Sequence, residues 1–286
     1  MRLLLALIAS SVPVLTFAEG AEHPRRAELL TFMGGHGCTL SPDSVDAAEA
    51  AGMPRGAIQD ITQSALENGE ASEQGAYIVF SESACQIRVP DIVSKYTAED
   101  AVICAGAPYV RETFQDGDIT AIDEGCFVED AVLLFAELED FDPRAGFEAF
   151  LAFTAAGLIA GDVRFYETSP LKTPKGFQVI SGAECGSAPN VEQVNANHSF
   201  LLDGFADYVR FVGARTECGD AIAYEVGPYV AELQGYDHSL DVDDQAAINA
   251  WLDFEFLFIT MAAGWHEGMT DVDAGTPRPP LCHYPG

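Results

Sequence analysis

The spacing of seven cysteines constrains the fold of this chain more than any other feature of its sequence. Six of them recur in one pattern: an opening cysteine, a Pro-Arg pair, an amphipathic stretch that ends at a glycine, and a closing cysteine. Cys38 and Cys126 each open such a unit, and Gly69 and Gly157 each follow 31 residues later. Self-similarity of this kind is typical of repeat architectures.

The first two units close at Cys85 and Cys185. A weaker third copy opens at Cys218, ends a helix-like stretch at Gly264 and closes at Cys282. The spacing therefore predicts three disulfides, Cys38–Cys85, Cys126–Cys185 and Cys218–Cys282. Cys104 is the unpaired candidate, either as a buried thiol or in an intermolecular bond, although an exchange with Cys85 or Cys126 also satisfies the count.

Within a unit, helix signals precede strand signals. Ser41 is a predicted N-cap, Pro42 stands at the first helical position, and Gly52 ends that helix. Gly69 and Gly157 suit the position after a helix where a positive φ is needed. Strands follow at 76–80 and 177–180, where β-branched and aromatic residues gather.

Three helices followed by a short β-hairpin resemble the outline of a winged-helix module. We therefore expect an α+β, mainly helical fold made of two or three disulfide-bracketed, winged-helix-like repeats. The expected units span residues 19–92, 93–190 and 191–286, the last of them divergent.

The first eighteen residues have the layout of a secretory signal peptide. Arg2 precedes an apolar stretch that Pro13 interrupts, and the segment ends on the small residue Ala18. Cleavage near Ala18 predicts a periplasmic or secreted protein, in which cysteines usually pair. The best remaining apolar stretch, 147–159, is too short to cross a bilayer, so we expect no membrane span in the mature chain.

The charge balance excludes one large class of partners. The chain has 286 residues, with 14 Lys and Arg against 45 Asp and Glu, for a net charge of −31. Phosphate contacts need clusters of basic residues, so we expect no nucleic-acid binding. The hydrophobic content of 48% is nevertheless enough to build a core.

Motifs for catalysis are missing from the sequence. It contains no G-x-S-x-G, no H-E-x-x-H beyond the first two residues at His266-Glu267, and no phosphate-binding loop. Six scattered histidines suggest no metal centre, although His36 and His283 lie close to cysteines in the chain. We therefore assign no catalytic residue and no cofactor.

Two acidic clusters suggest a weak calcium alternative, since carboxylate oxygens are the ligands that Ca²⁺ prefers. Neither cluster has the spacing of an EF-hand loop. The candidate ligands are Asp241, Asp243, Asp244, Asp271 and Asp273.

Three hypotheses for function remain. The first is an exported acidic protein that is not an enzyme and that binds an unknown protein or envelope component. The second is an exported hydrolase with a site between the repeat units, which requires a pocket with converging polar groups and a shifted pKa. The third is a calcium-binding acidic protein.

Overall fold

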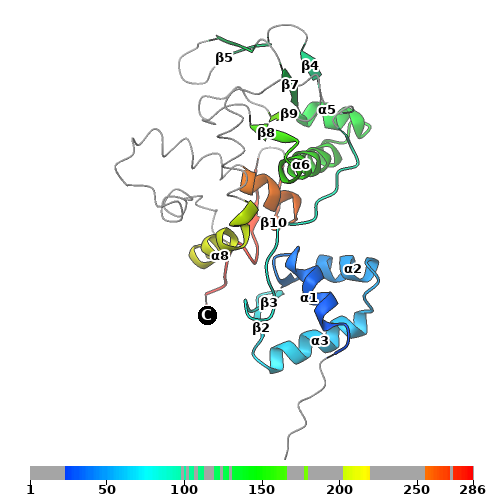
Figure 1. Ribbon diagram of the computed structural model, residues 1–286, viewed down its shortest axis with the longest axis vertical. Coiled ribbons are helices and arrows are strands. Elements are labelled where there is room, and N and C mark those ends of the chain that lie inside the picture. The colour runs from blue at the N-terminus through cyan, green and yellow to red at the C-terminus, as the bar shows by residue number, and fades with distance from the viewer. Residues whose placement is uncertain are drawn as a thin grey trace, which may run out of the picture.

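The computed structural model describes residues 23–97, 100, 103–105, 109–112, 119–122, 125–128, 131–165, 177–179, 202–219, 255–270 and 273–285. In these ranges the chain is a mixture of helices and small antiparallel sheets (Figure 1). The expected α+β class is therefore confirmed at this level. Within the same ranges, no helix combines the length and apolar character needed to span a bilayer.

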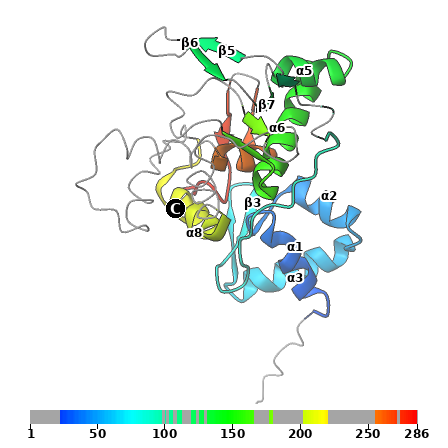
Figure 2. The same ribbon diagram turned by 45° about the horizontal axis from the view of Figure 1, so that its top comes forward.

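Residues 23–85 form what we call the N-terminal module. Its elements run in the order α1 (Arg26–Gly34), β1 (Thr39–Leu40), α2 (Pro42–Ala50), α3 (Arg55–Glu67), β2 (Ala71–Gln74) and β3 (Tyr77–Phe80). The three strands pair antiparallel in the order β1-β3-β2, so β3 lies in the centre of the sheet. Figures 1 and 2 agree in placing the three helices on one side of this sheet.

Local sequence signals fix α2. The side chain of Ser41 accepts a hydrogen bond from the Ser44 backbone, and the Ser44 side chain accepts one from the Ser41 backbone, which forms a capping box. Pro42 occupies the first turn, and Gly52 follows the helix with a φ of +93°. The predicted start and end of this helix are therefore confirmed.

The core of the N-terminal module is made almost entirely of its own residues. The helices contribute the buried side chains of Leu29, Met33, Ile58 and Ile61, and β3 contributes that of Phe80. The disulfide Cys38–Cys85 lies in the same cluster, joins Cα atoms 5.7 Å apart and spans 47 residues. The bond therefore closes a loop that supplies most of this core, and Leu29 and Met33 of α1 add to it from before Cys38.

The second region contains two packed helices and two small sheets. The helices are α5 (Ala131–Leu138) and α6 (Pro143–Ala160). One antiparallel sheet has the order β4-β7-β9-β8, with β4 at Ile103–Ala105, β7 at Gly125–Val128, β9 at Phe177–Val179 and β8 at Val163–Phe165. β5 (Tyr109–Glu112) and β6 (Ile119–Ile122) form a separate two-stranded ladder.

The segment before Cys126 forms strands, and Cys126 itself lies in β7. One expectation for this region is wrong. Gly157 does not end its helix, because α6 continues to Ala160 and Gly161 takes the positive φ of +87°. Gly157 is needed inside the helix for another reason: a Cβ there would lie 2.3 Å from Cγ2 of Val163 on β8.

The third region joins α8 (Phe205–Arg215), a helix at 255–262, and residues 264–270 and 273–285, which we call the C-terminal segment. The segment contains the strand pair β10 (His266–Glu267) and β11 (Thr276–Pro277). The disulfide Cys218–Cys282 ties the end of α8 to it across 64 residues.

The buried cluster of this third region is shared with other parts of the chain. Phe205, Phe256, Trp265 and Leu281 pack together with Ala155 of α6. Partly buried residues of the linker after the N-terminal module also contact this cluster, among them Ile87, Val89 and Ile92. The core thus connects residues on both sides of the predicted boundary at residue 190.

Candidate binding site between the N-terminal module and the C-terminal segment

The central strand of the N-terminal module is buried on both faces, and this double burial positions the site. Side chains alternate along a strand, so Ile78 and Phe80 face the helices while Tyr77 and Val79 face the opposite side. On that opposite side lie α8 and the C-terminal segment (Figure 2). The continuous apolar run Tyr77–Phe80 suits such a strand better than an alternating pattern would.

The N-terminal module and the C-terminal segment come into close contact at Gly37. This residue has a φ of +67°, and a Cβ there would lie 2.4 Å from Cγ of Pro280 and 3.1 Å from the Trp265 ring. Only glycine accepts both the backbone conformation and this contact. The turn after α1 therefore seats the N-terminal module directly on the C-terminal segment.

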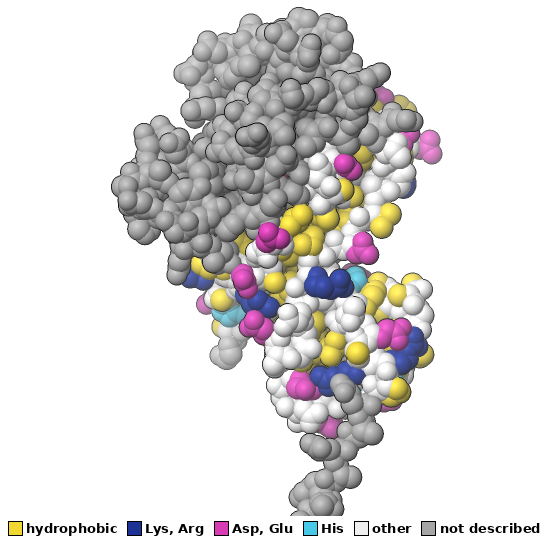
Figure 3. Space-filling model, viewed as in Figure 1, with side chains coloured by type: hydrophobic (Ala, Val, Ile, Leu, Met, Phe, Trp, Pro, Cys, Tyr) yellow, Lys and Arg dark blue, Asp and Glu magenta, His cyan; other side chains and the backbone are white. Residues whose placement is uncertain are grey.

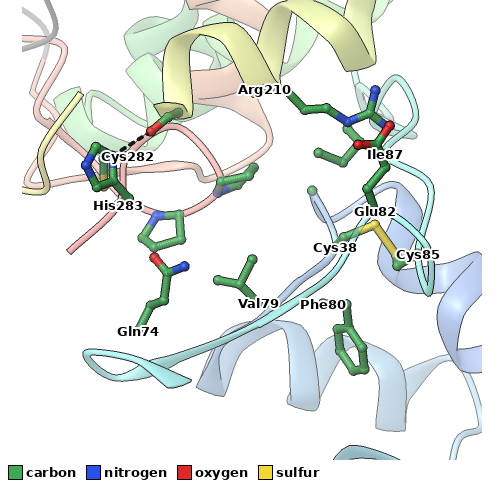
Figure 4. A pocket seen from close by; sticks show the side chains of 14 residues that line it. Cys38, Gln74, Val79, Phe80, Glu82, Cys85, Ile87, Arg210, Cys282 and His283 are labelled. Atoms are coloured by element: carbon green, nitrogen blue, oxygen red, sulfur yellow. Dashed lines mark hydrogen bonds and ion pairs between the residues drawn. A yellow bond between two sulfur atoms is a disulfide. The ribbon is translucent and has the colours of Figure 1, made fainter. Parts of the chain in front are cut away.

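Beside this contact is a cavity of about 270 Å³. We call it the junction cavity. Its apolar walls come from the β2–β3 hairpin and linker on one side and from the C-terminal segment on the other, chiefly Val79, Ile87, Pro279 and Pro280. Both disulfides contribute to the lining through Cys38, Cys85 and Cys282 (Figure 4). Each wall is thus covalently anchored.

An ion pair stands at one end of the junction cavity. Arg210 of α8 lies 3.3 Å from Glu82, which follows the hairpin, and 2.8 Å from Asp207 one turn earlier on α8. The side chains of Glu82 and Asp207 are 67% and 65% exposed, so this end opens to solvent. Two carboxylates therefore surround one guanidinium, which leaves this end negative.

The opposite end of the cavity presents a hydrogen-bond acceptor. Oε1 of Gln74 is enclosed, and it has no hydrogen-bond partner among the described residues. His283 lies on the same side in Figure 4, and its Nδ1 is 2.9 Å from the carbonyl oxygen of Gly213. A carbonyl only accepts, so Nδ1 is the donor.

A group of polar residues holds the N-terminal module and the C-terminal segment together next to the cavity, and three of them, Tyr77, His266 and Arg278, are buried. We call it the junction cluster: His36, Tyr77, His266, Glu267 and Arg278. Figure 3 shows a basic and a histidine side chain adjacent at the boundary between the N-terminal module and the rest of the chain. In that view, acidic side chains are scattered over the described surface rather than gathered in one patch.

Arg278 is the centre of the junction cluster and is only 8% exposed. Its Nε donates to the carbonyl of Gly264 at 2.6 Å, and Nη1 donates to the carbonyl of Pro279 at 3.0 Å. The guanidinium carbon is 5.7 Å from the centre of the Tyr77 ring. Burial lowers the pKa of Arg278, with the opposing charges of Tyr77, Asp43 and Glu267 acting against it.

Tyr77 crosses from the module to the C-terminal segment, where its hydroxyl donates to Oε1 of Glu267. Burial, followed by this hydrogen bond, raises the pKa of Tyr77 to about 12. The phenol is therefore protonated at neutral pH and serves as a donor.

The two histidines of the junction cluster are disfavoured as cations. His266 is 5% exposed, its Nε2 lies 3.0 Å from the hydroxyl of Thr260, and burial lowers its pKa to about 4. The backbone of Ala274 acts in the opposite direction on that pKa. Burial and then the charge of Arg278 lower the pKa of His36.

A second hollow, of about 570 Å³, lies on the N-terminal module beside α1. Its two basic side chains already have partners: Arg26 pairs with Glu70 at 2.9 Å, and Arg88 donates to the carbonyl of Thr31 at 2.6 Å. This hollow therefore offers no basic group that awaits a ligand.

The predicted cysteines divide into two groups. The pairs Cys38–Cys85 and Cys218–Cys282 are disulfides in the structure. Cys185 lies outside the described residues, so the pair Cys126–Cys185 stays a prediction. Cys104 and Cys126 are paired positions in the antiparallel β4–β7 ladder.

The calcium candidates fall mostly outside the described residues: Asp241, Asp243, Asp244 and Asp271. Asp273 is described, and its carboxylate accepts a hydrogen bond from the Gly275 backbone at 2.9 Å. Across the described part of the chain, no three residues with metal-ligating side chains gather in one place.

Sequence reasoning missed the residues that define the junction cavity and the junction cluster. Gln74, Glu82, Arg210 and Arg278 belong to no motif, and tertiary packing alone brings them together. The comparisons identify no relative: no protein-family model, no curated protein and no solved structure matches the chain.

Proposed function

We propose that this chain is an exported protein that binds a small ligand in the junction cavity and is not an enzyme. The observation that carries the proposal is a cavity between two walls that are each anchored by a disulfide. Fixed walls favour binding because less conformational freedom is lost when the ligand enters. The signal-like N-terminus and the paired cysteines support export.

The proposed architecture is a set of winged-helix-like repeats, of which the N-terminal module is the best example. Its order of three helices with a small strand between the first two, followed by a hairpin, supports this interpretation. The order of the elements in the second region differs, so the proposal of repeats rests on the first and third units.

Nucleic-acid binding is not part of the proposal, although many winged-helix modules bind DNA through a basic helix. The exposed face of α3 presents Gln59, Asp60 and Glu67. Its one basic residue, Arg55, is already paired with Asp46 at 2.6 Å and with Glu49. Such a surface repels phosphate.

A hydrolase is the weaker alternative. The groups with strongly shifted pKa, Tyr77 and His266, hydrogen-bond to Glu267 and Thr260 and do not line the junction cavity. Their arrangement supports a role in joining the two walls rather than in proton transfer to a substrate.

Ligand-observed NMR with a set of cationic, anionic and neutral aliphatic fragments tests the proposed function. Binding should be abolished by Val79→Trp, which fills the cavity, and retained by Gln63→Trp, which adds the same ring on the exposed face of α3. Fragments that still bind to Val79→Trp, or a wild-type protein that binds none, would contradict the proposal. Turnover of ester, peptide or glycoside substrates by the wild type would instead favour the hydrolase.

A further inference from the structure

The junction cavity has a hydrogen-bond acceptor at each end, Glu82 beside Arg210 at one and Gln74 at the other, and an apolar middle. Glu82 lies at the end near Arg210, whereas Gln74 and His283 lie at the other end, with Val79 between them (Figure 4). The cavity thus offers acceptors at both ends and hydrocarbon between them. A complementary ligand carries donors at both ends of an aliphatic chain.

The preference for a donor at the end away from Arg210 follows from Gln74. Its Oε1 is enclosed without a partner among the described residues, and a buried acceptor without a donor costs free energy. His283 lies on the same side, and its Nδ1 already donates to the carbonyl of Gly213. A ligand group with N–H bonds, such as a primary ammonium, can satisfy the acceptor on Gln74.

Charge at the open end points to the same chemistry. Asp207 and Glu82 contribute two negative charges near the single positive charge of Arg210. The whole chain carries −31, so its long-range field attracts cations and repels anions. A carboxylate ligand would have to enter against this field.

We infer that the junction cavity binds a small aliphatic α,ω-diamine, with one ammonium beside Glu82 and the other beside Gln74. This inference rests on the proposed function and specifies its ligand class. The volume of about 270 Å³ lies at the small end of ligand cavities, which suits a short diamine better than a drug-sized molecule. The apolar walls from Val79 and Pro280 contact the methylene chain.

Calorimetric titration with three probes of equal chain length tests the charge preference. The probes are 1,5-diaminopentane, pentane-1,5-diol and glutarate, each titrated into the full-length mature protein at low salt. We expect 1:1 binding of the diamine at least about ten-fold tighter than the diol, because hydrogen bonds to charged groups are the stronger ones. Glutarate should not bind.

Three variants then locate the ammonium groups. Gln74→Leu should weaken diamine binding about ten-fold, because it removes the enclosed acceptor. Glu82→Gln should weaken it about five-fold, since this carboxylate is solvent-exposed and screened. Glu73→Gln is the matched control, because it makes the same charge change on an exposed residue of β2 that does not line the cavity.

Each other outcome overturns a defined part of the account. Equal effects of Glu73→Gln and Glu82→Gln would mean a diffuse charge effect and no diamine site. Diol or glutarate binding that Val79→Trp abolishes would reject the diamine and leave the proposed function standing. Failure of all three probes and of the whole fragment set would reject both. Tighter binding of Nα-acetyl-lysine amide than of the diamine would reassign the site to a lysine side chain of a partner protein.

Discussion

The N-terminal module and the region around Cys218–Cys282 are each closed by one disulfide, but they are stabilised differently. The bond Cys38–Cys85 encloses a loop that packs against α1 within the same module, so the module's core comes from its own residues. The bond Cys218–Cys282 encloses residues that pack against α6 and against the linker after the module. The two loops span 47 and 64 residues, so the chain-entropy contribution of each bond is similar, at about 4 kcal/mol.

Two disulfides that close loops of similar length therefore do not produce regions with similarly independent cores. The module is self-contained on its helical side, whereas the C-terminal region is completed by other parts of the chain. The junction cavity forms where the face of the module's sheet that points away from its helices meets this shared region. The following experiments separate local from shared stabilisation.

Removal of the two disulfides should give the largest effects. We expect Cys38→Ser with Cys85→Ser, and separately Cys218→Ser with Cys282→Ser, each to lower the free energy of unfolding by about 4 kcal/mol. Hydrogen exchange should lose protection mainly within residues 26–80 for the first pair. For the second pair, protection should fall in the C-terminal segment and in α6 as well, since Ala155 belongs to the same cluster. Identical exchange patterns would contradict the comparison.

Acid should destabilise the junction through His266. Its pKa is about 4 in the folded protein against an ordinary value of 6.5. Below pH 6.5 the unfolded chain therefore takes up a proton that the folded chain does not, and stability falls until about pH 4. The expected loss is about 3 kcal/mol across this window.

Urea denaturation between pH 7 and 4 measures this effect by difference. His266→Gln should flatten the pH dependence relative to the wild type, whereas His23→Gln, outside the junction cluster, should leave it unchanged. An equal pH dependence in wild type and His266→Gln would show that the imidazole does not carry the acid sensitivity.

Replacement of Arg278 should weaken both regions together. Arg278→Met keeps much of the packing but leaves the Gly264 carbonyl without its donor, so we expect a loss of about 2 kcal/mol in urea denaturation. The stability of Arg278→Lys should lie between that of the wild type and that of Arg278→Met, because lysine keeps the charge but lacks the planar guanidinium. A neutral or stabilising effect of Arg278→Met, as some buried charges show, would contradict the role given to this residue.

Loss of a helix cap should have the smallest effect and should stay local. Ser41 caps α2 in the module, and Asp142 caps α6 by accepting from the backbones of Arg144 and Ala145. Ser41→Ala and Asp142→Ala should each cost about 1 kcal/mol. In hydrogen exchange, Ser41→Ala should lower protection only in the N-terminal module. Lower protection in α6 of this variant would show that the two regions unfold as one.

The sequence predicted the features that depend on local chemistry. The limits of α2 followed from Ser41, Pro42 and Gly52, and the positive φ of Gly69 followed from its place after α3. Regular cysteine spacing indicated the pairs Cys38–Cys85 and Cys218–Cys282, because both bonds close their predicted units.

Features that depend on contacts far along the chain were not predictable in this way. Gly157 looked like a helix end, but its contact with Val163 on β8 requires a glycine within α6. Arg210 and Gln74 lie more than a hundred residues apart in the chain and line the same cavity only because α8 packs on the module. No local pattern encodes this arrangement.

The most direct test of the central claim is methyl NMR of the protein labelled at valine and isoleucine, titrated with 1,5-diaminopentane. We predict saturable shifts of the Val79 and Ile87 methyl groups, which line the cavity, with no change at Ile61, which is buried among the helices of the module. Shifts that spare Val79 and Ile87, or that never saturate, would contradict a ligand site between the N-terminal module and the C-terminal segment.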